Sequence, residues 1–252
     1  MTTKQHREIY NKNLLHPWGD LSELGNDESS SVIVKGKGIH IFDSDGNKMI
    51  DGPAGMWCMQ TGYGRKEIAD AVSKQILSLS YATSFTLIND KETELAKRIS
   101  EQTPGDLNRI YFTTGGSTAV DSALRLCQLA NNIKGASNKK QIITREKAYH
   151  GSTYLSASVT GKERDKTAMD IKREGIHFLK APCHFYYPEF DNEDDFCDFL
   201  INELEEKIIE IGPENIMAFI AEPILASGGV IVPPKNYNYR CWEVVKLSLI
   251  HI

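Results

Sequence analysis

The chain has 252 residues, 40% hydrophobic and 25% charged, a composition that suits a soluble globular protein of one large or two modest domains. A formal net charge of -5 gives no indication of nucleic-acid binding, and no apolar run reaches the roughly 20 residues that span a bilayer. We therefore expect neither nucleic acid nor membrane among its partners. Five cysteines without a Cys-x-x-Cys pair, behind a polar N-terminus, favour a cytoplasmic protein with reduced thiols and no metal site.

The first part of the chain reads as a small β-meander. Strands are predicted over residues 32–34, 38–42 and 48–50. The sequence of residues 43–47 is typical of a hairpin turn between the last two strands. A loop with four glycines among aromatic and sulfur side chains follows over residues 52–64, and such a loop packs against or binds something.

From residue 65 onward, apolar positions at helical spacing alternate with short apolar runs. Helices are predicted over residues 65–80, 90–100, 118–131 and 194–211, with further helices from Ser152 and Tyr237. Strands are predicted over residues 109–112, 141–144, 176–179 and 216–220. This alternation predicts a mostly parallel sheet that is covered by helices on both faces, with ligands at the carboxyl ends of the strands.

A glycine-serine turn precedes the predicted helix 118–131. Gly116 allows a bound group to approach the backbone, Ser117 offers a hydroxyl, and the first N–H groups of the helix face the same point. The arrangement favours a phosphate or carboxylate, although many such turns serve steric purposes alone. Neither Gly-Lys-[Ser/Thr] nor Gly-x-Gly-x-x-Gly follows the strand, so no nucleotide site is predicted.

Two further groups follow strands of the predicted sheet. Tyr149 and His150 supply an aromatic face and an imidazole, a pair that by itself is more often packing than cofactor binding. Glu222 follows the strongly apolar strand 216–220, so its carboxylate requires a polar partner or a proton.

Taken together, these motifs resemble the class III aminotransferases, which are pyridoxal-phosphate enzymes of fold type I, and especially their ω-amino acid:pyruvate group. The resemblance runs over about residues 30–246. The motifs that carry it lie at residues 51–58, 62–65, 114–125, 149–152, 204–212, 221–224 and 228–234.

The resemblance implies an incomplete α/β fold of type I. Residues 1–64 would form the N-terminal, β-rich segment of the small domain, and residues 65–246 the first part of the mostly parallel, cofactor-binding large domain. Residues 247–252 break the family pattern, and we interpret them as a non-native tail on a truncated gene fragment.

The resemblance also implies a pyridoxal phosphate site. Gly116 and Ser117 would hold the phosphate, Tyr149 would stack on the pyridine ring, and His150 and Glu222 would line the site around it. A dianionic phosphate suits a helix N-terminus, and a flat ring suits an aromatic face.

On the substrate side, Trp57 resembles the aromatic residue of the family's pocket, and Phe85 resembles one that reaches the pocket of the neighbouring subunit. A homodimer is thereby implied. Thr118 stands where the family usually has glutamate. Because this position lies beyond the phosphate contacts, the difference affects the expected local hydrogen bonds and has little effect on the expected phosphate binding.

The implied reaction moves an amino group from an amine or ω-amino acid to a keto acid, with pyruvate as the expected acceptor. The family's Schiff-base lysine and the aspartate that protonates the pyridine nitrogen lie beyond the proline-rich loop, and neither is found in this chain. We interpret Lys180, the one lysine at a strand end, as a surface residue. The chain as written is therefore expected to be inactive. Alternatives are an aminomutase or racemase of the same scaffold, or a non-catalytic phosphate-binding paralogue.

Overall fold

The computed structural model describes residues 1–15, 30–167 and 169–247, and its chain divides into two compact units, Met1–Asn108 and Arg109–Ile252. Most of the segment interpreted as a non-native tail, residues 248–252, lies outside the described residues. The division follows compactness alone, so the assignment of residues 65–246 to one cofactor-binding domain stays a prediction.

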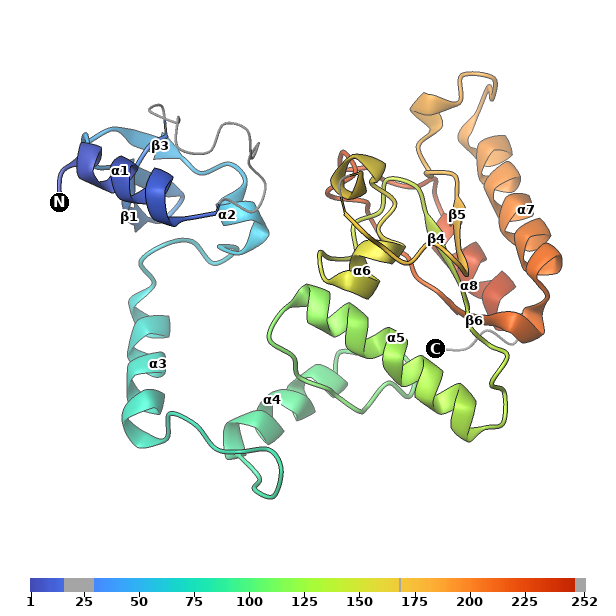
Figure 1. Ribbon diagram of the computed structural model, residues 1–252, viewed down its shortest axis with the longest axis horizontal. Coiled ribbons are helices and arrows are strands. Elements are labelled where there is room, and N and C mark those ends of the chain that lie inside the picture. The colour runs from blue at the N-terminus through green and yellow to red at the C-terminus, as the bar shows by residue number, and fades with distance from the viewer. Residues whose placement is uncertain (16–29, 168, 248–252) are drawn as a thin grey trace. The chain divides into compact units, whose positions relative to one another are not determined.

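The unit of residues 1–108 begins with helix α1 (Thr3–Asn13) and a three-stranded antiparallel meander (Figure 1). Its strands are β1 (Ile33–Lys37), β2 (His40–Asp43) and β3 (Lys48–Ile50). The predicted hairpin turn is confirmed, and the Asp43 carboxylate organises it. Its Oδ1 atom accepts the N–H groups of Asp45 at 3.0 Å and Asn47 at 2.8 Å.

The glycine-rich loop contains the short helix α2 (Ala54–Trp57), in which positive φ angles at Gly55 (59°) and Met56 (54°) interrupt regular helical geometry. The Asp51 carboxylate holds this loop together. Its Oδ2 atom accepts the Tyr63 hydroxyl at 2.6 Å and the Gly55 N–H at 2.8 Å.

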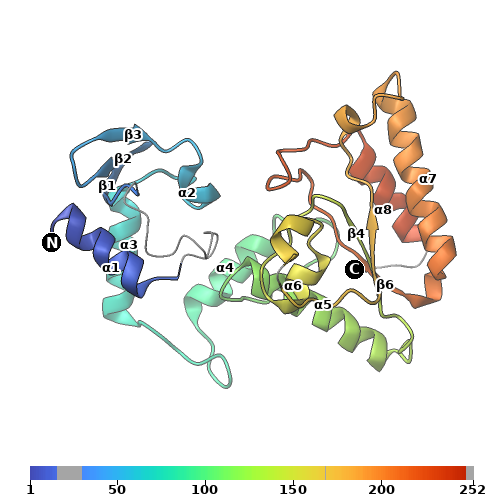
Figure 2. The same cartoon turned by 45° about the horizontal axis from the view of Figure 1, so that its top comes forward.

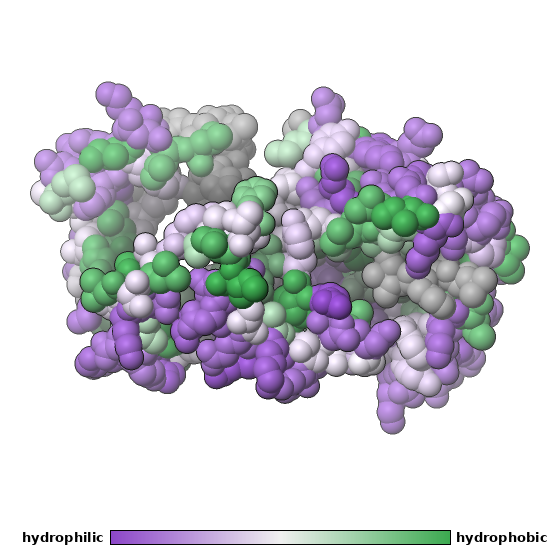
Figure 3. All heavy atoms as spheres, turned by 90° about the horizontal axis from the view of Figure 1, so that it is seen from below, coloured by the Kyte–Doolittle hydropathy of each residue, from purple (hydrophilic) through white to green (hydrophobic). Residues whose placement is uncertain are grey.

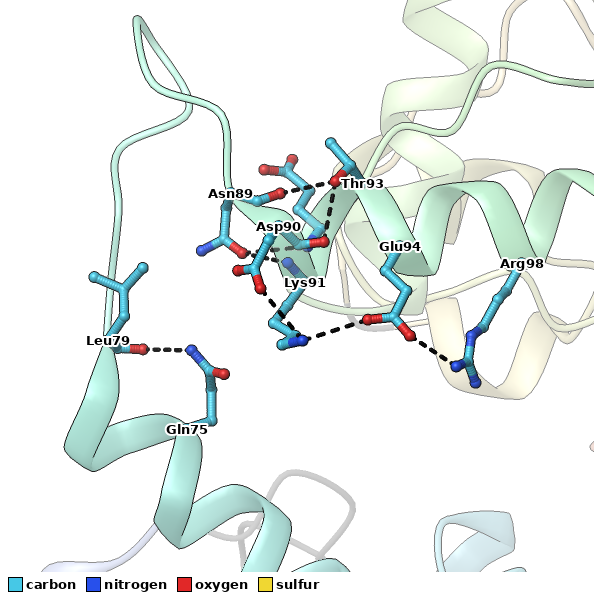
Figure 4. A network of polar contacts seen from close by, with 9 residues as sticks. Gln75, Leu79, Asn89, Asp90, Lys91, Thr93, Glu94 and Arg98 are labelled. Carbon is cyan, nitrogen blue, oxygen red and sulfur yellow. Dashed lines mark hydrogen bonds and ion pairs between the residues drawn. The ribbon is translucent and has the colours of Figure 1, made fainter.

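Helices α3 (Lys66–Ser78) and α4 (Asp90–Ser100) complete the first unit close to their predicted bounds. Asn89 is the N-cap of α4, because its side-chain oxygen accepts the N–H groups of Lys91 at 2.8 Å and Glu92 at 3.3 Å (Figure 4). The ion pair of Glu94 with Arg98, four residues on and 2.7 Å away, continues this polar network along the exposed face.

The unit of residues 109–252 is built on the parallel sheet β5-β4-β6. Its strands are β4 (Gln141–Arg145), β5 (Ile176–Leu179) and β6 (Ile216–Phe219). Its α-helices are α5 (Gly116–Ile133), α6 (Tyr154–Val159), α7 (Glu193–Ile211) and α8 (Tyr237–Leu247). Short 3-10 turns cover Glu163–Lys166, His184–Tyr186 and Pro213–Asn215.

Helices cover both faces of this sheet, as the alternation predicted (Figures 1 and 2). Successive residues of β4 enter opposite cores. Ile143 packs with the buried face of α7 and with α8, whereas Ile142 packs with α5 and the end of α6. The apolar face predicted for residues 194–211 lies in the first of these cores, where Phe196, Leu200, Leu204 and Ile208 are buried.

One predicted strand is wrong. Residues 109–112 form no strand, and Tyr111 and Phe112 are 69% and 40% exposed. The β-branched and aromatic composition is present, but a strand also needs a neighbour, and no segment among the described residues pairs with this one. Within the described part of the chain, no helix has the length and apolarity needed to cross a membrane.

Candidate functional site

Helix α5 begins at the glycine-serine turn with an uncapped N-terminus. Gly115, the residue before the helix, makes no side-chain cap. Among the described residues, the N–H groups of Gly116, Ser117 and Thr118 have no hydrogen-bond acceptor, whereas that of Ala119 already bonds to the Gly115 carbonyl at 2.9 Å. A Cβ atom added at Gly115 or Gly116 would meet nothing within 4 Å. Open space thus adjoins a set of free donors.

Ser117 joins this helix start to the loop after β4. Its Oγ atom accepts the Ser152 N–H at 3.0 Å, and its carbonyl accepts the Thr153 hydroxyl at 3.4 Å. The Ser117 hydroxyl proton is not used in these bonds and remains available for a ligand. Gly151, at φ +139°, permits the approach, because a Cβ atom there would lie 2.7 Å from Ser117 Oγ.

His150 lies beneath that loop and is 8% exposed. The Thr144 hydroxyl donates to the Val159 carbonyl at 3.0 Å, so its contact with His150 Nε2 at 3.2 Å requires the imidazole to donate from Nε2. Burial, together with the nearby Arg145 charge, lowers the pKa of His150 to about 4. The ring is therefore neutral at physiological pH and is held as the Nε2–H tautomer.

Tyr149 and Glu222 meet across the carboxyl ends of β4 and β6. The Tyr149 N–H donates to Glu222 Oε1 at 2.8 Å, and this bond supplies the polar partner expected for the carboxylate. The Lys162 ammonium lies 5.7 Å from the centroid of the Tyr149 ring and donates to Ser227 Oγ at 3.0 Å. The loop after β6 is thus tied to the tyrosine from two directions.

Arg145 and Asp121 belong to this region and were not predicted. Arg145 is fully buried at the end of β4, and its Nη2 atom donates to the Glu222 carbonyl. The Asp121 carboxylate of α5 accepts the Ser156 N–H of α6 at 2.7 Å. The signal that could have found Arg145 is a charged residue at the end of a buried strand, two positions after Ile143.

Trp57 and Phe85 belong to the compact unit of residues 1–108, whereas the five predicted cofactor residues belong to the unit of residues 109–252. Trp57 is 50% exposed with φ +66°, and Phe85 is 95% exposed. Their roles at a substrate pocket stay predictions.

Lys180 lies on the α7 side of the sheet, where its ammonium pairs with Glu203 Oε1 at 3.2 Å. It also lies over the ring of Phe199, 5.3 Å from the centroid, with its side chain 40% exposed. Among the described residues, no group of three or more metal-ligating side chains is placed to hold a metal ion.

The start of α5 fits a phosphate. It offers three N–H groups and a hydroxyl proton. Gly115 and Gly116 have no Cβ atom that would obstruct an anion, and the space at those positions is open. The positive end of the helix dipole favours a dianion at the same point.

The sequence and the structure also resemble known proteins. The family model described as "Aminotransferase class-III" matches residues 22–247. The putrescine–pyruvate aminotransferase of Pseudomonas aeruginosa is 37% identical over 246 residues, which are 96% of this chain and 53% of that protein.

Two solved structures share the fold closely. An (S)-enantioselective omega-transaminase from Thermomicrobium roseum has a TM-score of 0.94 and 32% identity, over 98% of this chain and 55% of that one. The omega transaminase from Pseudomonas jessenii in complex with PMP has a TM-score of 0.92 and 32% identity, over 96% and 54% of the two chains.

The chain thus spans about half the length of these relatives, and the expected partial α/β fold of type I is confirmed. The match with the family model and the likeness to omega-transaminases agree with the family resemblance of the sequence. The chain belongs to the class III aminotransferases, a pyridoxal-phosphate-dependent family.

Proposed function

We propose that the whole protein is an aminotransferase that moves an amino group from an amine or ω-amino acid to pyruvate with pyridoxal phosphate. The observation that carries the proposal is the uncapped start of α5, joined by Ser117 to the loop of Tyr149. The putrescine–pyruvate relative supports both an amine donor and pyruvate as acceptor.

Each predicted cofactor residue has a task in this proposal. The N–H groups of Gly116 and Ser117, with the Ser117 hydroxyl, bind the phosphate. Tyr149 offers its ring as a stacking surface, and Glu222 fixes the backbone of that residue. His150, neutral and bonded to Thr144 through Nε2, holds the loop after β4 in place. When bound, the cofactor supplies the electron sink that stabilises a carbanion at the donor carbon.

The remaining features of the whole protein belong to the same proposal. Trp57 and Phe85 contribute to substrate pockets of a homodimer, and the cytoplasm suits the five free cysteines. The residues 1–64 and 65–246 are parts of the small and large domains. The lysine and aspartate that complete the reaction lie in the part of the relatives' length that this chain does not span, so the 252 residues alone are inactive.

Binding is tested by equilibrium dialysis of the purified protein against pyridoxal phosphate, with pyridoxal as the control that lacks the phosphate. We expect clear preference for the phosphorylated compound and weaker binding after Ser117→Ala. The matched control is Ser122→Ala, which lies further along α5. Equal binding of the two compounds would show that the helix start is not a phosphate site.

Catalysis is tested by alanine formation from putrescine and pyruvate with the protein of full family length. An aminomutase or racemase would instead give product without any added keto acid. For the 252 residues alone, we expect no lysine to retain a pyridoxyl group after borohydride reduction, and one labelled lysine would overturn the claim of inactivity.

A further inference from the structure

Arg145 is a buried cation that forms no ion pair among the described residues. It is 0% exposed at the end of the central strand β4, and its Nε atom has no hydrogen-bond partner within the described part of the chain. Burying a guanidinium costs free energy unless its donors are used well. Its remaining contacts therefore indicate what this residue does.

Those contacts reach the Glu222 carbonyl and the first two residues of α8. The Nη2 atom donates to the Glu222 carbonyl, and Nη1 donates to Asn238 Oδ1 at 3.4 Å. The Asn238 side chain in turn donates to the Pro223 carbonyl at 3.0 Å. The guanidinium also lies over the ring of Tyr237, 5.6 Å from its centroid. Two consecutive carbonyls after β6 are thus fixed by one network.

The same segment supplies the carboxylate that holds Tyr149. Glu222 is bonded at its carbonyl by Arg145 and at its carboxylate by the Tyr149 N–H. A displacement of the Glu222 backbone would therefore move the acceptor away from this amide. Asn238 is the second residue of α8 and is exposed, so it reaches the network from outside the core.

We propose that Arg145 is a positioning residue of the proposed cofactor site: it fixes the Glu222 backbone so that the Glu222 carboxylate holds Tyr149 in place. This inference rests on the proposed function. Arg145 itself contacts neither the uncapped helix start nor the Tyr149 ring, and it acts on the site through Glu222.

The first test is hydrogen exchange at the Tyr149 amide, which needs no cofactor. Arg145→Met and Asn238→Ala are each expected to accelerate exchange at this amide, by about tenfold for the first variant. The Ser152 amide, held by Ser117 Oγ at 3.0 Å, is the internal control and keeps its rate. Arg164→Met, with the substituted side chain 85% exposed in the native protein, is the matched control variant.

The second test is binding of pyridoxal phosphate by equilibrium dialysis. Arg145→Met is expected to weaken binding by about tenfold. Arg145→Lys should restore part of the loss, because an ammonium reaches one acceptor but not two. In a Glu222→Ala background, which removes the acceptor of the Tyr149 N–H, the further loss from Arg145→Met should be smaller, since the two residues act in one chain of contacts.

The outcomes separate the positioning role of Arg145 from the proposed cofactor binding. Native exchange at the Tyr149 amide in folded Arg145→Met, or equal losses of binding in both backgrounds, would overturn the positioning role. If Arg145→Met does not fold, Asn238→Ala decides, and native exchange in that variant overturns the proposal. A wild-type protein that binds no pyridoxal phosphate contradicts the proposed function, while the exchange rates still test Arg145.

Discussion

At the scale of single residues, hydrogen bonds at the site fix the protonation state and tautomer of its side chains. His150 shows this most clearly, because Thr144 can donate only once and gives its proton to the Val159 carbonyl. The histidine must then donate, and its burial disfavours a second proton. A histidine in this state holds the backbone of the loop and does not act as a proton carrier near neutral pH.

The pH dependence of stability tests this state of His150. Its pKa is about 4 in the folded protein against the ordinary 6.5, so the unfolded protein binds more protons between these values. Stability from this group is complete above pH 6.5 and falls as the pH is lowered toward 4, by about 3 kcal/mol.

The measurement is urea unfolding of wild type and His150→Gln at several pH values between about 4.5 and 7, which cover most of the expected transition. Over this range the variant should lose less stability than wild type on acidification. The same slope in both proteins would contradict a neutral, buried imidazole.

At the scale of elements, the site is the junction of α5 with the loop and helix that follow β4. Ser117 and Asp121, one turn apart on α5, accept the N–H groups of Ser152 and Ser156. This places the free donors of one helix start directly beside the loop that carries Tyr149. Gly151 makes the close approach possible. Gly151 and Gly116, the two glycines of this junction, differ sharply in the space available for an added Cβ atom.

Gly151→Ala is expected to destabilise the protein by about 3 kcal/mol. The new Cβ atom would lie 2.5 Å from Ser156 Oγ and 2.8 Å from Ser117 Cα, at a φ of +139° that disfavours any side chain. Gly116→Ala is the matched control, because nothing lies within 4 Å of its added Cβ. Its effect on urea unfolding should stay within about 0.5 kcal/mol, and equal effects would show that the junction is not tightly packed.

Much of this element structure is readable from the sequence, since hydrophobic periodicity is a local property. Residues such as Phe196, Leu200 and Leu204 mark α7 and its buried face without any knowledge of the neighbours. The segment 109–112 shows the limit, because strand formation depends on a partner that composition does not reveal. Arg145 shows the same limit for the site, as its acceptors lie 77 and 93 residues further along the chain.

At the scale of the whole molecule, many large apolar side chains remain exposed in both units. Figure 3 shows apolar atoms in green among the hydrophilic ones in purple. On α3, one stripe contains Ile68, Val72 and Ile76, which are 46%, 52% and 59% exposed. Contiguous apolar surface of this kind favours association.

We expect the purified 252-residue chain to self-associate, and Val72→Lys to weaken that association by placing a charge in the stripe. Lys74→Ala, on the same helix but outside the stripe, is the control that should leave association unchanged. Sedimentation velocity over a range of concentrations measures the effect. A chain that stays monomeric, or one whose association is unchanged by Val72→Lys, would contradict the role of this surface.

The sheet order β5-β4-β6 has a consequence for how the site comes into existence during folding. The bonds that build it join residues 35 apart at Ser117 and Ser152 and 73 apart at Tyr149 and Glu222. Closing such loops costs entropy before any contact compensates for it, so the site forms only after β4 and β6 have paired. Acquisition of cofactor affinity would therefore mark a late step in refolding and report that β4 has paired with β6.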